Sequence, residues 1–311
     1  MVSEKMRYDF GRATRERTAL LAVGDHCQLP PVEGRPGFDL EHATARLDRI
    51  HRQAEGSPVL VLSQAVREAR LSAGGDLQAA GQRVGVRTVR VSLDQLARQL
   101  ARQREADVAA IMVTNKARVW TNHRVRVHAG LPGFDAAGPQ VGEKIVVVRT
   151  ACGVGAGETG TVVSSEVGPE PLVGFRTQHC QIDFGHCVKD CHVPLEGWRY
   201  CDPARGPAWE AKGEHLRDVG ALTRKSWAQL DELSRDYSAE NDLLRQVVDS
   251  LLEVCPGYAI TAWKAQGSQW VGGAVVLEPL GWMKQDAWRV VYTAVTRFRE
   301  RLTLIEPTSA Y

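Results

Sequence analysis

Residues 20–32 read Leu20-Leu21-Ala22-Val23-Gly24-Asp25-His26-Cys27-Gln28-Leu29-Pro30-Pro31-Val32. The apolar run at its start predicts a short buried strand, Leu20 to Val23, that stops at Gly24 and Asp25. A polar loop follows and ends at the two prolines. In open α/β sheets, ligands bind at the carboxyl ends of the strands. We therefore expect Asp25 and Gln28 at a binding edge, where the neutral amide of Gln28 offers both donors and an acceptor.

Size and composition are those of a globular protein. The 311 residues suffice for two domains, and 43% of them are apolar. No apolar run approaches the roughly 20 residues of a membrane span, and the amino terminus lacks the plan of a signal peptide. The seven cysteines, an odd number, favour reduced thiols. These features predict a cytoplasmic protein without a membrane partner.

The charge distribution is more informative than the net charge of +2. Residues 46–126 carry 15 Lys and Arg against 7 Asp and Glu. Such a local basic excess suits contacts with nucleic-acid phosphates. A solvated arginine-rich surface is the alternative reading.

Helices are predicted from their caps and from apolar spacing. The expected helices cover Ser3 to Arg12, begin at Ser57-Pro58 and begin again at Ser92, where Gln95 completes a capping box. Gly74-Gly75 and the stretch Gly81 to Gly85 predict a loop between the second and third of these helices. A buried strand, Val108 to Val113, is followed by a helix through Asn122 to Arg126.

Alternating segments at Val141 to Val148, Gly160 to Ser164 and Gln181 to Phe184 predict a group of strands. The glycine-rich stretch Gly153 to Gly157 reads as a tight turn between two of them. It cannot be a P-loop, because no Lys-Ser/Thr follows it.

The last part of the chain predicts two further features. Tyr258 to Trp270 reads as a strand ending in a polar turn, where Gly267 lets the backbone approach a ligand and Lys264, Gln266 and Ser268 point into one cleft. Trp288 to Arg297 reads as a helix with Tyr292 and Arg297 directed towards that cleft, and residues 302–305 form a final strand.

Four of these stretches resemble motifs of superfamily 1 helicases, in the same order. Gly24 to Val32 resembles motif III, GDxxQLPPV, most closely that of the RecD-like helicases, which move 5′ to 3′ on DNA. Residues 51–53, around Arg52, resemble motif IV. Residues 258–270 resemble motif V, with Trp263 in the place of the usual histidine. Residues 292–297 resemble motif VI, Y-T-A-x-T-R, and residues 1–6 resemble the segment that follows the Asp-Glu of motif II.

The resemblance implies an α/β fold of P-loop NTPase (RecA-like) helicase domains. The first would be truncated, and the second interrupted by a small SH3-like β-barrel insert. The implied ranges are 1–75 for the remainder of the first domain, 76–140 for a linker and the start of the second, 141–225 for the insert and 226–311 for the rest of the second domain.

The implied function is that of the carboxyl-terminal part of an ATP-dependent DNA helicase, which couples ATP hydrolysis to translocation on single-stranded DNA, with ATP and Mg²⁺ as ligands of the complete motor. The resemblance implies nucleotide contacts, with Gln28 and Arg297 as the catalytic pair, at Gly24, Asp25, Gln28, Arg52, Gln266, Gly267 and Arg297. It implies DNA contacts at Lys116, Arg118, Arg124, Thr261, Trp263, Lys264 and Ser268.

One requirement of phosphoryl transfer is missing from the sequence. No G-x-x-x-x-G-K-[ST] occurs, and the reaction needs that cradle together with a carboxylate-held Mg²⁺. We therefore expect the chain alone to hydrolyse no ATP. A split gene with a separate chain carrying the P-loop, a misassigned start codon and a decaying remnant all fit. A non-catalytic nucleic-acid-binding remnant is the alternative function.

Thiols and imidazoles, both zinc-ligand types, gather late in the predicted strands, at His179, Cys180, His186, Cys187, Cys191, His192 and Cys201. Their spacing is irregular and contains no C-x-x-C pair. Apolar cysteines and turn histidines of a small barrel are the favoured reading, and structural zinc is the alternative.

Overall fold

The computed structural model describes residues 2–14, 18–31, 34–46, 56–72, 75–167, 176–195, 198, 201, 203 and 250–308. The chain forms two compact units. The first consists of Met1–Thr88 and Pro279–Leu302, and the second of Val89–Glu278 and Thr303–Tyr311. The range 226–311 therefore contributes to both units, and the four expected domain ranges stay predictions. Arg52 and Val32 lie outside the described residues.

The first unit is built from helices, which are α1 (Glu4–Ala13), α2 (Pro58–Ala69), α3 (Gly75–Arg83), the 3₁₀ turn η2 (Gly281–Asp286) and α9 (Ala287–Val295). Helix α2 begins where Ser57-Pro58 predicts, and its buried Val59, Leu62 and Val66 recur at three and four residues. Helix α9 is buried along almost its whole length and packs against α2. This helix pair forms the core of the unit.

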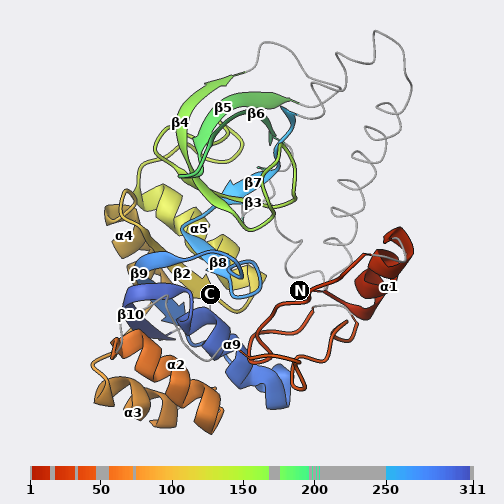
Figure 1. Cartoon of the computed structure of the whole chain (residues 1–311). Helices are drawn as coiled ribbons and strands as arrows, with labels where there is room; N and C mark the ends of the chain where they lie inside the picture. Colours follow the sequence, from red (N-terminus) through yellow and green to blue (C-terminus); the bar gives the residue numbers. More distant parts are fainter. Residues whose placement is uncertain are drawn as a thin grey trace. The chain divides into compact units, whose positions relative to one another are not determined.

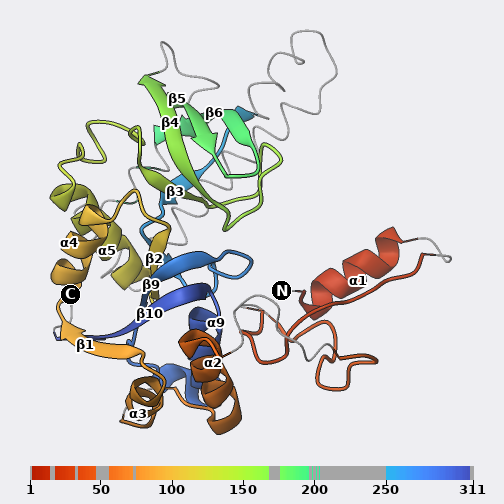
Figure 2. The same ribbon diagram turned by 60° about the vertical axis from the view of Figure 1, so that its left-hand side comes forward.

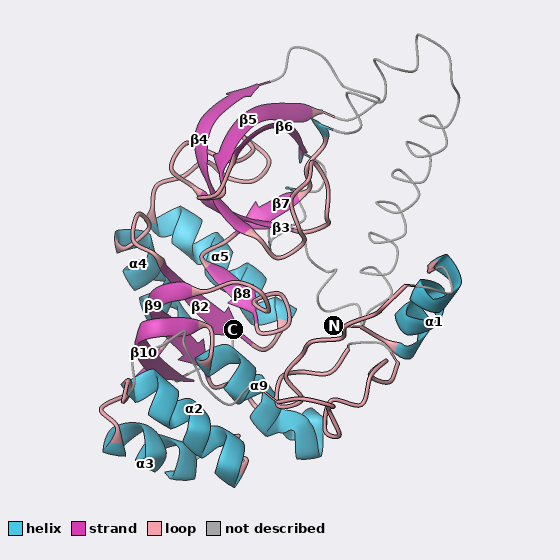
Figure 3. Cartoon of the chain, viewed as in Figure 1, coloured by secondary structure: helices cyan, strands magenta, loops and turns pink. Residues whose placement is uncertain are grey.

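The strand predicted at Leu20 to Val23 is wrong. Residues 18–25 form neither helix nor strand (Figure 3), and the exposed fractions of Leu20, Leu21 and Val23 are 59%, 86% and 81%. A strand needs neighbouring strands to satisfy its backbone groups. None of the described strands pairs with this segment, so its apolar composition alone does not make it a strand.

The loop predicted at Gly74-Gly75 and Gly81 to Gly85 is wrong for residues 75 and 81–83, which belong to α3. It is right for residues 84–85, which form a turn. Glycine inside a helix costs about 1 kcal/mol relative to alanine. Leu77 and Gly81 are both buried on α3, and the packing of this face offsets that local cost.

A five-stranded sheet has the order β1-β10-β9-β2-β8, and its strands β2, β8 and β9 lie wholly in the second unit. Strand β2 is parallel to both β8 and β9, and all its residues are buried. The strands are β1 (Arg87–Val91), β2 (Val108–Met112), β8 (Ala259–Thr261), β9 (Trp270–Val276) and β10 (Phe298–Pro307). This sheet confirms the α/β class.

Helices α4 (Leu93–Arg102) and α5 (Asn115–His128) lie side by side against this sheet (Figures 1 and 2). The predicted capping box starts α4, because Ser92 Oγ accepts from the Gln95 backbone N–H at 3.2 Å and Gln95 Oε1 accepts from the Ser92 N–H at 2.9 Å. The apolar face of α4 joins the core formed by β2 and α5, and its residues are Leu93, Leu96, Ala97 and Leu100.

A second, antiparallel five-stranded sheet has the order β6-β5-β4-β3-β7. Its strands are β3 (Lys144–Val147), β4 (Thr159–Val167), β5 (Thr177–Asp183), β6 (Val188–Pro194) and β7 (Val254–Pro256). In sequence it lies between α5 and β8, so it interrupts the α/β unit. Strands β3, β4 and β5 overlap the three predicted segments, because the alternation that predicts them is local. Strand β7 was not predicted, and it lies outside the range 141–225 expected for the insert.

This antiparallel sheet curls strongly (Figure 1). His192 on β6 forms a bridge with Leu251, and the Leu252 N–H donates to the His192 carbonyl at 2.9 Å. The chain that enters β7 therefore contacts the strand at the opposite edge of the sheet. Among the described residues, no helix has the length and apolar character needed to cross a bilayer.

Candidate functional site

The loop after Gly24 is organised by the carboxylate of Asp25. Its Oδ1 accepts from the Cys27 N–H at 2.9 Å, and its Oδ2 accepts from the side-chain amide of Gln28 at 3.1 Å. Aspartate favours such turns because its short carboxylate reaches the backbone two residues on. The side chain of Gln28 is therefore held against Asp25.

Helix α9 binds this loop at three points within the first unit. The Tyr292 hydroxyl donates to Asp25 Oδ2 at 3.1 Å, and the Leu29 N–H donates to Thr293 Oγ1 at 3.0 Å. The guanidinium of Arg289 donates to the carbonyl of His26 and, at 3.5 Å, to that of Gln28. The structure thus brings together the stretches that resemble motifs III and VI.

Arg289 is the member of this site that sequence reasoning missed. It is held by Asp286 at 2.9 Å and lies 4.9 Å from the ring centre of Trp288. Positions 289, 292 and 293 recur at three and four residues, so they share one face of α9. That spacing places Arg289 on the same face as Tyr292 and Thr293, but nothing in the local sequence indicates that the loop docks on this face.

Arg297 is buried, with an exposed fraction of 3%. Its Nε donates to the Thr293 carbonyl at 3.0 Å and its Nη2 to Thr296 Oγ1 at 3.0 Å. The guanidinium therefore lies along the end of its own helix. Thr293 connects the loop to Arg297, because its hydroxyl accepts from the Leu29 N–H and its carbonyl accepts from Arg297. The catalytic role of Arg297 stays a prediction.

In the second unit, the turn after β8 contacts the β3–β4 loop. Lys264 Nζ donates to the Val148 carbonyl at 3.3 Å, and Ser268 Oγ donates to the Gly157 carbonyl at 2.9 Å. A Cβ on Gly157 would lie 2.7 Å from the Lys264 carbonyl oxygen, and its φ is +92°, so only glycine fits there. Lys264 and Ser268 are thus directed at this loop rather than at an open cleft.

The remaining residues of this turn stay close to the strand end. Thr261 is buried, and its Oγ1 accepts from the Lys264 N–H at 3.4 Å. Trp263 accepts from the Gln266 N–H through its carbonyl at 3.4 Å. Gly267 has a φ of +93°, which favours glycine, as the polar turn predicts.

Glu278 occupies the amino end of α5. Its carboxylate accepts from the N–H of Val113, from the Thr114 N–H at 3.0 Å and from Thr114 Oγ1 at 2.6 Å. A helix amino terminus attracts anions because its first N–H groups have no partner in the helix. Glu278 binds the backbone just before the first turn of α5, and Thr114 Oγ1 in turn accepts from the Ala117 N–H of that turn at 3.2 Å.

Most of the predicted DNA-binding cations on α5 contact protein groups. Arg118 Nη1 lies 3.2 Å from Cys255 Sγ, and Arg124 Nε lies 2.6 Å from Asp94 Oδ1. Arg126 is buried against Glu143. Lys116 is exposed on the surface of the helix. Of the three predicted DNA contacts on α5, Lys116 is exposed, and Arg118 and Arg124 are half-buried.

Only Asp25, His26 and Cys27, within the described part of the chain, bring three metal-ligand types within 4.8 Å of one another. Three neighbouring residues fall short of the four converging ligands of a structural zinc site, so they make no convincing metal centre. The described cysteines and histidines of β5 and β6 do not converge in this way. His179 instead contacts Asp190 and the ring of His192.

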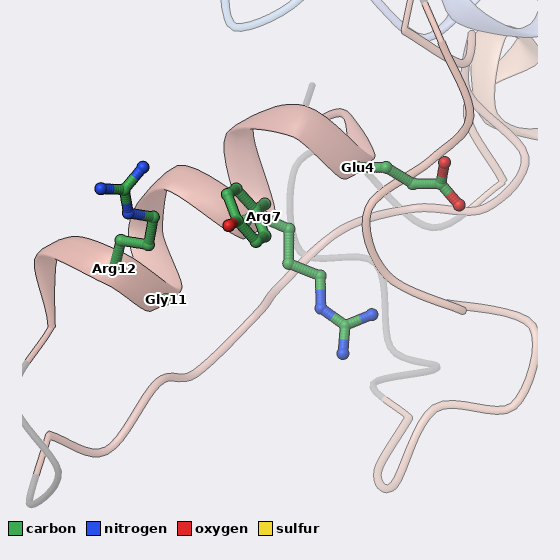
Figure 4. Close-up of a pocket in the computed structure, with 5 residues that line it drawn as sticks. Glu4, Arg7, Gly11 and Arg12 are labelled. Carbon is green, nitrogen blue, oxygen red and sulfur yellow. The ribbon is translucent and has the colours of Figure 1, made fainter.

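A surface recess of about 430 Å³ is lined by Glu4, Arg7, Tyr8, Gly11 and Arg12. All five residues belong to α1, and Figure 4 shows Arg7 and Arg12 pointing to opposite sides of this helix. The Arg7 guanidinium donates to the Gly37 carbonyl at 3.0 Å. A recess along one helix surface lacks the converging groups of a ligand site.

No model of a known protein family matches the sequence, and no curated protein matches it. The functional argument therefore rests on the residues and contacts described above.

Proposed function

We propose that this chain is the carboxyl-terminal part of a superfamily 1, RecD-like DNA helicase. In the complete motor, ATP hydrolysis with Mg²⁺ would drive translocation on single-stranded DNA in the cytoplasm. One observation carries the proposal. Tyr292 binds Asp25 and Thr293 binds Leu29, and these pairs are separated by 267 and 264 residues of sequence. Both the loop and the helix belong to stretches that resemble helicase motifs.

These contacts suit a nucleotide-sensing role. In the proposed motor, Gln28 contacts the terminal phosphate and the attacking water. The Asp25 oxygen that holds Gln28 also accepts the Tyr292 hydroxyl, so a movement of Gln28 changes the contact of the loop with α9. Arg297 follows on the same helix and is proposed to neutralise charge on the transferred phosphoryl group.

The finer fold assignment belongs to the same proposal. We assign the helix-covered parallel strands to a RecA-like domain and the curled sheet between α5 and β8 to an SH3-like insert. The P-loop would come from a separate segment or chain, because no G-x-x-x-x-G-K-[ST] occurs in these 311 residues. The same observation favours a second candidate, a non-catalytic single-stranded-DNA-binding remnant.

The test is a fusion that supplies the missing chemistry. A segment carrying motifs I to II of a RecD-like helicase is joined ahead of residue 2, and ATP hydrolysis is measured with and without oligo-dT. We expect DNA-stimulated hydrolysis that falls about 10³-fold or more in Arg297→Ala and also falls in Gln28→Ala. The control is Arg301→Ala, which removes an exposed arginine.

A fusion that binds Mg-ATP yet shows no DNA-stimulated hydrolysis contradicts the helicase proposal. If the unfused chain also binds oligo-dT in fluorescence anisotropy, the binding remnant is supported instead. Full activity in Arg297→Ala would remove the role proposed for that arginine.

A further inference from the structure

Two buried cysteines of the second unit share a hydrogen bond next to an arginine. Cys255 lies on β7 with an exposed fraction of 3%, and Cys201 follows β6 with a fraction of 8%. Both are free thiols, and their side chains are hydrogen-bonded to each other. Arg118 Nη1 on α5 lies 3.2 Å from Cys255 Sγ. The two thiols and the guanidinium thus form one cluster.

The charges around this pair favour one thiolate. The hydrogen bond from Cys201 lowers the pKa of the Cys255 thiol, and the charges of Arg118 and Lys264 lower it further against the opposing effect of burial. The same hydrogen bond raises the pKa of Cys201. Glu253, the acidic group near Lys264, has its own pKa raised by burial, and Arg149 opposes this shift. Cys255 is thus the acceptor and Cys201 the donor.

The chain contains a matched pair in a different environment. Cys180 and Cys191 lie opposite each other in the β5–β6 register, and both are fully buried. Burial raises the pKa of Cys180 to about 11 and that of Cys191 further above its usual range. Cys191 Sγ donates to the Cys180 carbonyl at 3.5 Å. These thiols stay protonated and therefore react slowly as nucleophiles.

We propose that Cys201 and Cys255 are an oxidation site that hydrogen peroxide converts to a disulfide, with Arg118 holding Cys255 as the attacking thiolate. The Cys255 sulfur attacks one peroxide oxygen, so that an S–O bond forms, the O–O bond breaks and hydroxide leaves and is protonated by solvent. The Cys201 sulfur then attacks the sulfenic acid at Cys255. An S–S bond forms, and the hydroxyl leaves with the Cys201 proton as water.

The burial of the pair selects the oxidant. Hydrogen peroxide is little larger than water, whereas aromatic or glutathione disulfides need open access to the attacked sulfur. Oxidation also removes the thiolate that accepts from Arg118. The disulfide would covalently join the segment after β6 to β7.

The test uses the full chain of 311 residues, reduced and then treated with equimolar hydrogen peroxide at several pH values. N-ethylmaleimide stops the reaction, and peptide mapping by mass spectrometry identifies the linked cysteines. We expect a Cys201–Cys255 linkage to form first, while Cys180 and Cys191 are still alkylated. Its rate is expected to rise with pH and level off below about pH 8.5, the ordinary thiol pKa.

Variants separate the roles of the residues. Cys201→Ser should leave a sulfenic acid at Cys255 that dimedone traps, and Cys255→Ser should abolish both products. Arg118→Met should slow the reaction roughly tenfold near neutral pH, as a rise of one pKa unit would, and Arg118→Lys should recover much of the rate. Arg98→Met, which removes an exposed arginine on α4, is the control.

The wild-type chain alone can overturn the proposal, so the test does not depend on whether a variant folds. Linkage of Cys180 to Cys191 before Cys201 to Cys255 would do so. The proposal would also be contradicted by a linkage rate that rises only at pH values around the ordinary thiol pKa. An unchanged linkage rate in a folded Arg118→Met variant would contradict it as well.

Discussion

At the scale of the residue, Asp25 determines the conformation of its loop. One carboxylate accepts from a backbone N–H, an amide and a phenol, contributed by Cys27, Gln28 and Tyr292. Hydrogen bonds to an ionised group are stronger than those between neutral groups. Burial raises the pKa of Tyr292, so its hydroxyl keeps its proton and remains a donor at neutral pH.

Removing that donor tests the contact between the loop and α9. Tyr292→Phe deletes the hydroxyl that binds Asp25 and keeps the ring, so we expect the free energy of unfolding to fall by about 1–2 kcal/mol. Urea denaturation followed by circular dichroism measures the change. Tyr8→Phe, at a tyrosine that is 66% exposed, is the control and should match the wild type. Equal stability of Tyr292→Phe and Tyr8→Phe would show that the contact contributes nothing.

The sequence identified part of this site and missed the rest for a physical reason. Asp25, Gln28 and Tyr292 belong to stretches that resemble helicase motifs. The loop after Gly24 and helix α9 lie where the sequence predicts them. Arg289 binds carbonyls of a loop whose path depends on docking against α9, and no local pattern encodes that path. Arg118 was likewise expected at DNA, whereas its sulfur partner lies 137 residues away.

At the scale of the element, Asp94 joins α4 to α5. Its Oδ1 lies 2.6 Å from Arg124 Nε and 3.0 Å from His128 Nε2. Burial opposes ionisation of Asp94, but hydrogen bonds from Arg124 and His128 outweigh it and lower the pKa of the carboxyl. Because its pKa is lower in the folded chain, ionised Asp94 stabilises the fold at pH values above the carboxyl pKa of the unfolded chain, which is about 4. This contribution disappears as the pH falls through the carboxyl pKa of the folded chain.

We therefore expect Asp94→Asn to lower the free energy of unfolding by about 0.5–1 kcal/mol at pH 7. The difference from the wild type should shrink as the pH drops below 4, because the wild-type carboxyl then becomes neutral as well. Urea titrations at pH 7 and pH 3 measure it. Glu105→Gln, which changes an exposed carboxylate, should have no such effect. A pH-independent difference would contradict the ionic origin.

A buried ion pair joins α5 to the start of the antiparallel sheet. The side chains of Arg126 and Glu143 are 2% and 0% exposed. The Arg126 guanidinium also lies 4.6 Å and 4.9 Å from the ring centres of Phe134 and Trp198. Removing one partner of such a pair leaves an uncompensated buried charge.

Arg126→Met is therefore expected to lower the free energy of unfolding by about 3–5 kcal/mol, whereas the double change Arg126→Met with Glu143→Leu should recover much of it. Thermal and urea unfolding provide the measurement. Arg98→Met, at an exposed arginine, serves as the control. A double variant no more stable than the single one would show that packing, rather than charge, dominates the loss.

Elements with local signals were predictable, and those that depend on distant partners were not. The capping box at Ser92 and the apolar face of α4 are encoded within ten residues, and both are confirmed. Leu20 to Val23 has the composition of a strand, but strand formation depends on a neighbour that the segment itself cannot specify. Helix α3 is the opposite case, because its local sequence disfavours a helix and its tertiary packing favours one. Burial of Leu77 and Gly81 outweighs the cost of glycine inside the helix.

At the scale of the whole molecule, we expect these 311 residues alone to hydrolyse no ATP. The sequence holds neither the P-loop lysine nor its phosphate cradle, and these groups position the phosphates and Mg²⁺ in this chemistry. A coupled phosphate-release assay with oligo-dT is the measurement, with the P-loop fusion as the positive control. DNA-stimulated activity of the unfused chain that Arg297→Ala abolishes would refute this expectation.

The placement of the antiparallel sheet between α5 and β8 has a kinetic consequence. Strands β2 and β8 are neighbours in the parallel sheet, yet residues 113–258 separate them, so bringing them together costs loop-closure entropy. Pairing of β3 with β7 brings the two ends of the intervening segment together and shortens the loop still to be closed. We therefore expect the inserted sheet to form early on the folding pathway, so that mutations weakening it would slow refolding of the parallel sheet around β2.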